Sequence, residues 1–289
     1  MKELTTALVL LVLIPSVALA QTYEVGLFMG VSGYQGDLVS KAYEAEDLNL
    51  AYGAVFRYNL YQSLSFKAGI NKGRISGSDQ NVEDDFHGHR SRNLSFESDI
   101  LEFHVQAEYN LFGYNVLENI RQFSPYVLVG VSAFAFKPRA FYEGRWHELQ
   151  PLGTEGQGME GYEAPYKLRQ ISVPLGCGFK MSISDAVNLA FELGFRKTFT
   201  DYLDDVSGQY PDLNALQEAR NETAVALSYR RPEVDPGAPI DPIGGARGNP
   251  DNKDWYFFNG FTLTFNIGQG VYNSRNFRSS PIPKGLPIF

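Results

Sequence analysis

The sequence has almost no cysteine, and beyond its first residues it has no long apolar run. Cys177 is the single cysteine among 289 residues, so an intrachain disulfide is excluded. No Cys and His spacing matches a structural zinc site. After residue 20 no apolar stretch approaches the roughly 20 residues that a membrane-spanning helix needs, which excludes a helical membrane protein. Stability must therefore come from packing and strand pairing.

Basic residues are also in deficit. The chain has 25 Lys and Arg against 33 Asp and Glu, a formal net charge of -8, and its basic residues are scattered along the chain. A nucleic-acid-binding surface would gather them into a stripe or patch. We therefore expect no nucleic-acid partner.

The first 20 residues have the features of a secretory signal peptide that is removed. Lys2 precedes an apolar core at residues 8–14, and Ala18, Leu19 and Ala20 supply a small-residue cleavage site. Gln21 is then the expected mature N-terminus. Because residue 21 is not cysteine, lipid attachment at that position is not expected.

The mature chain alternates between apolar and polar residues with the period of a β-strand. The clearest segment places Leu101, Phe103, Val105, Ala107, Tyr109 and Leu111 on one face and Glu102, His104, Gln106, Glu108 and Asn110 on the other. Residues 171–181 and 187–195 repeat the pattern, and in the former Cys177 is predicted to be an outward apolar residue. One face suits lipid and the other suits water.

Together with weaker copies, the pattern predicts eight strands. They span residues 23–32, 48–58, 63–75, 101–111, 124–137, 171–181, 187–195 and 255–268. The gaps after the second, fourth and sixth strands are short, whereas the gaps after odd-numbered strands are long, as in outer-membrane barrels with short periplasmic turns. We predict an all-β fold: an eight-stranded antiparallel transmembrane β-barrel over residues 21–268, with long extracellular loops and both termini in the periplasm.

A soluble sandwich or lipocalin-like barrel is the competing interpretation, because it also alternates but with its apolar face inward. Aromatic residues near the segment ends favour the membrane, where such residues form girdles at both interfaces. They are Tyr58, Tyr109, Phe112, Trp255 and Phe257.

If the apolar face points outward, the inward face carries a balanced set of charges with one histidine. Its predicted members are Glu24, Arg57, Lys67, Glu102, His104, Glu108, Lys180, Glu192 and Arg196. An eight-stranded barrel is just wide enough for side chains to fill it. The charges therefore predict an internal plug rather than an open diffusion pore.

No catalytic, cofactor or metal site is predicted. His104 lies among polar inward residues and is interpreted as part of the interior network. Asp201, Asp204 and Asp205 could bind Ca²⁺, but their spacing does not match the twelve-residue calcium loop. The glycines of residues 153–158 lack the lysine of a phosphate-binding loop and are interpreted as conformational.

The last long loop and the C-terminal tail differ in character. Residues 211–222 predict a short helix, whereas residues 231–252 are rich in proline and should be irregular. The tail, residues 269–289, has three basic residues and no acid, and its prolines exclude a paired strand. We expect partner contacts there through Arg275, Phe277, Arg278, Lys284 and Phe289. A tail without any partner is the alternative.

Several stretches carry a family resemblance. They are YQGDL from Tyr34, RNLSFESDILEFHVQAEYN from Arg92, WHELQPLGTEGQG from Trp146, RKTFTDYLDDVSGQY from Arg196 and DWYFFNGFTLTF from Asp254. The chain resembles the PorG-like outer-membrane barrel family over residues 23–267. That resemblance implies a non-enzymatic accessory subunit of the type IX protein secretion system, placed at the outer membrane with a periplasmic ring built from a lipoprotein and its partner.

Two functional hypotheses follow. The first is an outer-membrane barrel of a Gram-negative bacterium that anchors or organises this periplasmic ring and contacts outer-membrane lipid. The second is a surface-binding barrel whose long external loops hold a ligand or secreted cargo. A solute channel and a lipid-modifying rim enzyme are disfavoured, the first by the balanced interior charges and the second by the lack of a Ser, His and acid set.

Overall fold

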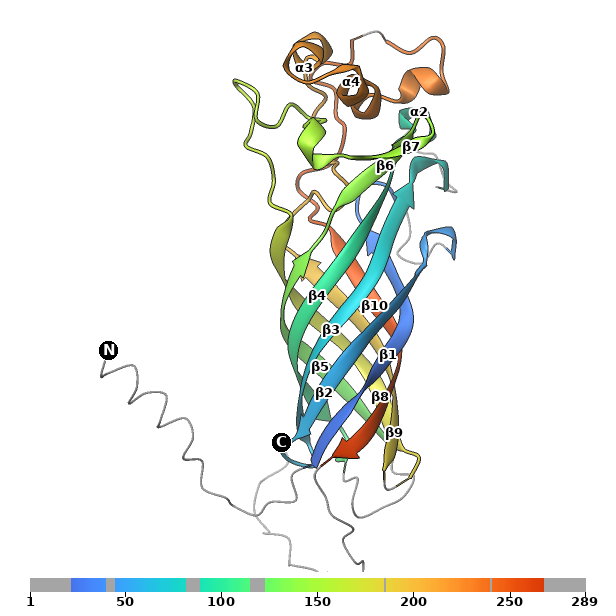
Figure 1. The fold of residues 1–289 in the computed structure, drawn as a ribbon, viewed down its shortest axis with the longest axis vertical. Coiled ribbons are helices and arrows are strands. Elements are labelled where there is room, and N and C mark those ends of the chain that lie inside the picture. The colour runs from blue at the N-terminus through green and yellow to red at the C-terminus, as the bar shows by residue number, and fades with distance from the viewer. Residues whose placement is uncertain are drawn as a thin grey trace, which may run out of the picture.

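The computed structural model describes residues 22–39, 45–81, 89–114, 123–184, 186–239 and 241–267 (Figure 1). The predicted signal peptide and the predicted tail lie outside these residues, as do the tail residues expected to contact partners. Residues 115–122, within the predicted turn after the fourth strand, are also outside them.

Eight long antiparallel strands close into a barrel. They are β1 (Thr22–Gln35), β2 (Asn49–Asn59), β3 (Leu64–Ser78), β4 (Ser95–Asn110), β5 (Phe123–Ala135), β8 (Arg169–Ser182), β9 (Val187–Thr198) and β10 (Trp255–Ile267). Each pairs with its neighbours in sequence order, β1 pairs with β10, and the β3–β4 pairing closes the circle. The predicted eight-stranded antiparallel barrel is confirmed.

Glycine allows the tight curvature that so few strands require. A Cβ at Gly26 would lie 2.0 Å from the carbonyl oxygen of Leu263, and a Cβ at Gly30 would lie 2.1 Å from that of Asn259. Both glycines are on β1, where the backbone of β10 comes too close for any side chain. Gly is the residue that permits such an approach.

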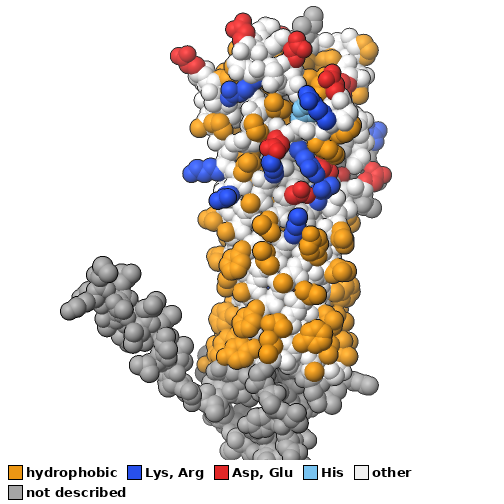
Figure 2. Space-filling model, in the orientation of Figure 1, with side chains coloured by type: hydrophobic (Ala, Val, Ile, Leu, Met, Phe, Trp, Pro, Cys, Tyr) orange, Lys and Arg blue, Asp and Glu red, His pale blue; other side chains and the backbone are white. Residues whose placement is uncertain are grey.

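The exposure of the two strand faces decides between the membrane barrel and the soluble barrel in favour of the membrane barrel. Outward apolar side chains are largely exposed, for example Leu27 at 69%, Val131 at 66% and Met29 at 65%, whereas inward Glu24 and Glu108 are 0% exposed. On the face in view, Figure 2 shows the exposed apolar side chains gathered in a band over the half of the barrel where the chain enters β1 and leaves β10. A soluble sandwich or lipocalin would have the opposite arrangement, so that interpretation is wrong. A closed barrel with such a band is the architecture of an outer-membrane-type protein.

The fourth strand begins earlier than predicted, at Ser95 instead of residue 101. Above Leu101 its two faces exchange character: outward Glu97 and Asp99 are charged, and inward Phe96 and Ile100 are buried and apolar. The strand thus continues out of the apolar band into water, where the arrangement of a soluble protein applies. Strand β1 likewise runs on to Gln35 and β3 to Ser78.

The connections differ at the two ends of the barrel. Short turns join β2 to β3 and β8 to β9 at the end where β1 begins and β10 ends, here called the turn end. The opposite end, the loop end, carries the shorter elements: η1 (Ala45–Asp47), η2 (Asp79–Asn81), α2 (His89–Arg92), β6 (Pro138–Tyr142), β7 (Arg145–Glu148), η3 (Gln150–Leu152), α3 (Leu213–Ala219), α4 (Glu222–Ser228) and η4 (Arg231–Glu233). None of the helices in the described ranges is long and apolar enough to cross a membrane.

The helix predicted at residues 211–222 is present as α3, with the Asp212 side chain accepting hydrogen bonds from the Asn214 and Ala215 amides at its N-terminus. A second helix, α4, follows and was not predicted. The β6–β7 hairpin, which extends from β4 above the apolar band, was not predicted either.

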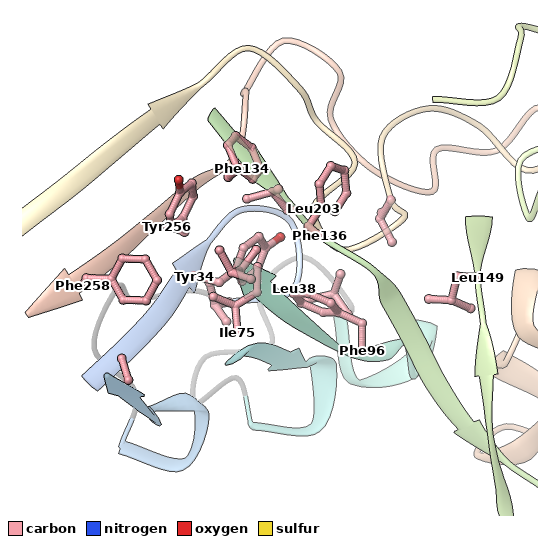
Figure 3. Packing of buried hydrophobic residues seen from close by; sticks show 14 of the residues in the cluster. Tyr34, Leu38, Ile75, Phe96, Phe134, Phe136, Leu149, Leu203, Tyr256 and Phe258 are labelled. Atoms are coloured by element: carbon pink, nitrogen blue, oxygen red, sulfur yellow. The ribbon is translucent and has the colours of Figure 1, made fainter. Parts of the chain in front are cut away.

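An apolar cluster fills the barrel at the loop end (Figure 3). Its members come from β1, β3, β4, β5, β10 and the long loops, and include Tyr34, Leu38, Ile75, Phe96, Phe134, Phe136, Leu203, Tyr256 and Phe258. Several are fully buried, Leu38 and Leu203 at 0% exposure. The loops are therefore packed onto the barrel mouth by the same hydrophobic effect that stabilises a soluble core.

Candidate functional site

The nine residues predicted to form an interior charge network all lie inside the barrel. Each side chain is buried, from Lys180 at 0% exposure to Glu192 at 5%. They come from β1, β2, β3, β4, β8 and β9, and they occupy the inward positions of those strands. The structure divides them into two groups, one centred on Glu108 and the other on Glu102.

Glu108 of β4 is the centre of the group nearer the turn end. Its carboxylate accepts a hydrogen bond from Arg57 Nε at 3.0 Å and from Lys180 Nζ at 2.9 Å. Lys67 Nζ lies 3.6 Å from its other oxygen and also forms an ion pair with Glu192. Three cations and two carboxylates are thus linked across five strands, β2, β3, β4, β8 and β9.

Arg57 extends this group to Glu24 of β1. Its Nη1 donates to Glu24 Oε2 at 2.8 Å, and the same carboxylate accepts hydrogen bonds from Asn59 and Thr264, each at 2.6 Å. The two oxygens of Glu24 therefore have three donors. A buried charge is tolerated when it is paired and hydrogen-bonded in this way.

Glu102 of β4 is the centre of the second group. Arg196 donates to both of its oxygens, from Nε at 3.0 Å and from Nη2 at 3.1 Å, in a bidentate pair. Tyr256 donates its hydroxyl at 2.7 Å, and His104 Nδ1 lies 3.1 Å away. Phe258 covers the Arg196 guanidinium, its ring centre 5.0 Å from Cζ.

Between the two groups lie buried polar atoms without a hydrogen-bond partner among the described residues. Both polar atoms of the Gln106 side chain, together with His104 Nε2, are buried without a hydrogen-bond partner in the described part of the chain. Gln106 is on β4, between the centres of the two groups. Unsatisfied polar atoms of this kind are the usual positions of buried water.

This interior is suited to filling the barrel rather than to conducting solutes. Four carboxylates balance four Lys and Arg side chains, and the apolar cluster of Figure 3 lies above them. His104 is held by Glu102, and among the described residues no arrangement of Ser, His and acid appears around it. The interior tyrosines, Tyr126 and Tyr256, occupy inward positions that the alternation could have identified.

The sequence stretches that carry the family resemblance meet at the loop end. Tyr34 donates its hydroxyl to Asp204, so the first stretch contacts the fourth. Asp254, at the start of the last stretch, accepts a hydrogen bond from the Leu203 amide at 2.8 Å. Arg92, which begins the second, donates to the backbone oxygen of Asp37 at 2.7 Å.

Glu155 joins the third stretch to this assembly. Its carboxylate accepts hydrogen bonds from the backbone amides of Ser207 at 2.9 Å and Gly208 at 3.1 Å. Arg247, from the proline-rich loop, donates to Glu155 at 3.0 Å and to the Asp205 backbone oxygen at 2.5 Å. We call Tyr34, Glu155, Asp204, Asp205 and Arg247 the loop knot. Nothing in the local sequence marked Arg247, which lies 92 residues from Glu155.

The three aspartates considered for calcium have separate environments. Asp205 is bonded to Tyr166 at 2.6 Å and to Thr154, and Asp204 to Tyr34, while neither oxygen of Asp201 accepts a hydrogen bond from the described residues. Among the described residues, no three His, Cys, Asp or Glu side chains are placed to hold a metal ion.

Burial raises the pKa of several of these acids. The pKa of Asp205 is raised from 3.8 to about 6 by burial, against the lowering effect of the Arg247 charge. Burial likewise raises the pKa of Asp201 to about 6. The pKa of Asp204 is raised well above its usual value by burial and by the charge of Asp37. The folded conformation of the loop end is therefore more stable when these carboxyl groups carry protons.

Glycine supplies the left-handed backbone that the third stretch needs. Gly153, Gly156 and Gly158 have φ of 60°, 83° and 81°. This agrees with the conformational interpretation of these glycines. Asp205 also has a positive φ of 67°, a cost its three side-chain partners offset.

A family model described as "Domain of unknown function (DUF6089)" matches residues 2–223. No curated protein matches the sequence. One similar solved structure is Ail, the attachment invasion locus protein of Yersinia pestis, in complex with the heparin analogue sucrose octasulfate, with 8% identity, TM-score 0.40, and coverage of 86% of this chain and 99% of Ail. Another is the outer membrane protein OprG from Pseudomonas aeruginosa, with 10% identity, TM-score 0.38, and coverage of 85% and 95%.

Proposed function

We propose that this chain, which belongs to the family described as Domain of unknown function (DUF6089), is a non-enzymatic outer-membrane subunit of a type IX protein secretion system. In this proposal it anchors or organises a periplasmic ring that contains a lipoprotein and its partner. The turn end and both termini face the periplasm, and the loop end faces outward.

The observation that carries the proposal is the filled barrel. Balanced ion pairs occupy the interior and an apolar cluster occupies its mouth, so solutes have no route through the described residues. A barrel that transports nothing through itself can act through its two ends. The resemblance of the loop-knot stretches to PorG-like barrels supports the secretion system as the setting.

The tail is the proposed periplasmic contact. Arg275, Arg278 and Lys284 give it positive charge without any acid, and Phe277 and Phe289 give it apolar side chains. Such a segment can order on an acidic partner surface. The short turns at the same end are the second contact surface.

Crosslinking of the full-length protein in isolated outer membranes tests this proposal. Mild-detergent purification and mass spectrometry should then recover ring subunits crosslinked to residues 269–289 or to the turn end. A triple variant, Arg275→Glu, Arg278→Glu and Lys284→Glu, should reduce that recovery, while a matched triple change at the loop end, Arg145→Glu, Lys167→Glu and Arg220→Glu, should not. Recovery of a lone barrel, or equal recovery from both variants, would reject the proposal.

Surface binding is the second candidate, favoured by a hollow at the loop end. It has a volume of about 380 Å³, lies beside α3 and α4, and is lined by Leu213, Val225 and Tyr229 with Glu222 and Glu233. Glu233 is already paired with Arg230 at 2.9 Å, and Glu222 is the other acid at the edge. An apolar floor with this acid at its edge suits an amphipathic peptide that carries a basic residue. Loss of cargo binding in a Val225→Asp variant, with ring association intact, would favour this function.

A further inference from the structure

A row of four outward residues crosses the barrel at the edge of the apolar band. Lys72 of β3 lies opposite Leu101 of β4, Leu101 lies opposite Ala135 of β5, and Ala135 lies opposite Arg169 of β8. Neighbouring strands are about 4.8 Å apart, so the Cα atoms of Lys72 and Arg169 are about 14 Å apart along the surface of the barrel. Each cation ends the row, and two apolar residues lie between.

This row lines a hollow of about 230 Å³, which we call the rim groove. Asp99 and Lys137 line its edge nearer the loop end. Its floor is apolar, because Leu101 and Ala135 lie between the cations. A groove with charged ends and an apolar floor can receive a molecule that is itself polar at its edges.

The rim groove lies at the boundary between the apolar band and water. One row nearer the turn end, Ile70, Phe103 and Ile171 are 48%, 57% and 65% exposed, as expected of lipid contacts. One row nearer the loop end, Arg74 forms an ion pair with Asp99 at 3.0 Å, which belongs in water. Figure 2 shows Lys and Arg side chains gathering at this edge of the band. The groove is therefore at the depth of lipid headgroups.

The cations at the ends of the row are not neutralised. Within the described part of the chain no carboxylate pairs with Lys72 or Arg169, and both side chains are exposed. The nearby acid, Asp99, is already paired with Arg74, and Lys137 is paired with Glu148. Two positive charges thus face the headgroup layer, where each attracts an anionic lipid.

We propose that the rim groove binds a disaccharide lipid that carries a phosphate at each end. Lys72 and Arg169 each donate hydrogen bonds to one phosphate, Arg169 through its bidentate guanidinium. The sugars lie over Leu101 and Ala135, and the acyl chains run down the apolar band beside Phe103. The Cα atoms of Lys72 and Arg169 are about 14 Å apart along the surface. Their long, exposed side chains can therefore reach both ends of such a disaccharide, which favours this lipid over one with a single phosphate. This inference requires the barrel to span a membrane, and it is independent of the secretion role.

Native mass spectrometry of the full-length protein in detergent tests the proposal. The probe is a bisphosphorylated, acylated disaccharide (lipid A), compared with the same lipid after removal of both phosphates. A Lys72→Gln and Arg169→Gln double variant should bind the phosphorylated lipid about 30-fold more weakly, since each cation near a membrane surface contributes about 1 kcal/mol. The dephosphorylated lipid should bind the wild type as weakly as the phosphorylated lipid binds the variant.

The matched control is a Lys197→Gln and Arg145→Gln double variant, which removes the same charge from β9 and β7. It should bind lipid as the wild type does. Equal weakening in both double variants would overturn the proposal in favour of a general effect of net charge. Displacement of the lipid by millimolar inorganic phosphate would overturn it in favour of a free-phosphate site. Since the substituted side chains are exposed, both variants should keep the heat-modifiable migration of a folded barrel.

Discussion

Arg247 and Glu155 form an ion pair at 3.0 Å, although 92 residues separate them. Both side chains are buried, Arg247 at 2% and Glu155 at 8% exposure. The pair joins the loop between β7 and β8 to the loop between β9 and β10, and Arg247 also donates to the backbone oxygen of Asp205. The two longest loops are thereby one packed unit.

Replacement of Arg247 by Met should therefore open the loop knot without unfolding the barrel. The change leaves Glu155 and Asp205 buried without their cation, and breaking a buried pair from one side costs about 3 to 5 kcal/mol. Hydrogen exchange measured by mass spectrometry should show faster exchange at residues 153–158 and 203–208. As a control, Arg231→Met removes an exposed pair with Asp235 and should cost under about 0.5 kcal/mol. Unchanged exchange in Arg247→Met would contradict the structural role of the pair.

The loop knot should be more stable at pH 5 than at pH 7.5. The pKa of Asp205 is raised from 3.8 to about 6, so its folded form binds a proton more tightly than the open form does. Such a group contributes stability that is complete below about pH 4 and is lost as pH rises through 6, about 3 kcal/mol in all for a buried carboxyl. The pKa of Asp201 is raised in the same direction.

Hydrogen exchange at residues 201–208, corrected for its intrinsic pH dependence, measures this effect. An Asp201→Asn variant should lose part of the pH dependence and keep the rest, which belongs to Asp205 and its neighbours. Greater protection at pH 7.5 than at pH 5 would show that the sign is wrong.

A charged residue on the outward face within the apolar band should destabilise the folded barrel. Val129 of β5 is 56% exposed in the apolar band, and an Arg near the middle of a bilayer costs a barrel about 2 to 4 kcal/mol. Val129→Arg should lower the temperature at which the protein loses its folded migration in detergent gels. Phe141→Arg, at a site on β6 above the band that is 48% exposed, should have little effect. Equal effects would indicate that no lipid contacts Val129.

The effects of substitutions at Arg196 and Glu102 on the free energy of unfolding should be coupled. Arg196→Met leaves Glu102 buried with only hydroxyl, amide and imidazole partners. Glu102→Gln leaves the guanidinium buried without its carboxylate, so each single change should cost about 3 to 5 kcal/mol. The double variant should cost less than the sum, by at least about 1 kcal/mol, because residues in one network do not act additively. Urea unfolding of the four proteins in detergent measures this coupling, and additive costs would argue against a direct pair.

The strands and the interior residues could be predicted because lipid-facing apolar residues alternate with interior polar residues along each strand of a membrane barrel. Glu102, His104 and Glu108 alternate with apolar neighbours on β4, and each lies inside as expected. The predicted start of β4, at residue 101, was wrong for a physical reason. The alternation continues through Phe96 and Ile100, but the faces exchange character where lipid gives way to water.

The loop end could be predicted only in fragments. Asn221 is a recognisable helix start, and its side chain does accept from the Ala224 amide at 2.9 Å, so α4 had a usable signal. The contact of Arg247 with Glu155 had none, because irregular loops have no periodicity to align residues so far apart. The acids at 201–205 suggested a cation, yet Asp205 is bonded to Thr154 and Tyr166, two distant residues of the loop between β7 and β8.

The exchange of faces at Ile100 and Leu101 also fixes how deep the protein can sit. Sinking by one pair of residues would carry Asp99 into hydrocarbon, and rising by one pair would lift Phe103 into water. The strand continues from Leu101 to Ser95, about 20 Å of rigid ladder. The loop knot therefore lies beyond the headgroup layer, on the part of the barrel that extends into water. A molecule that approaches it from solution contacts protein before it contacts the bilayer.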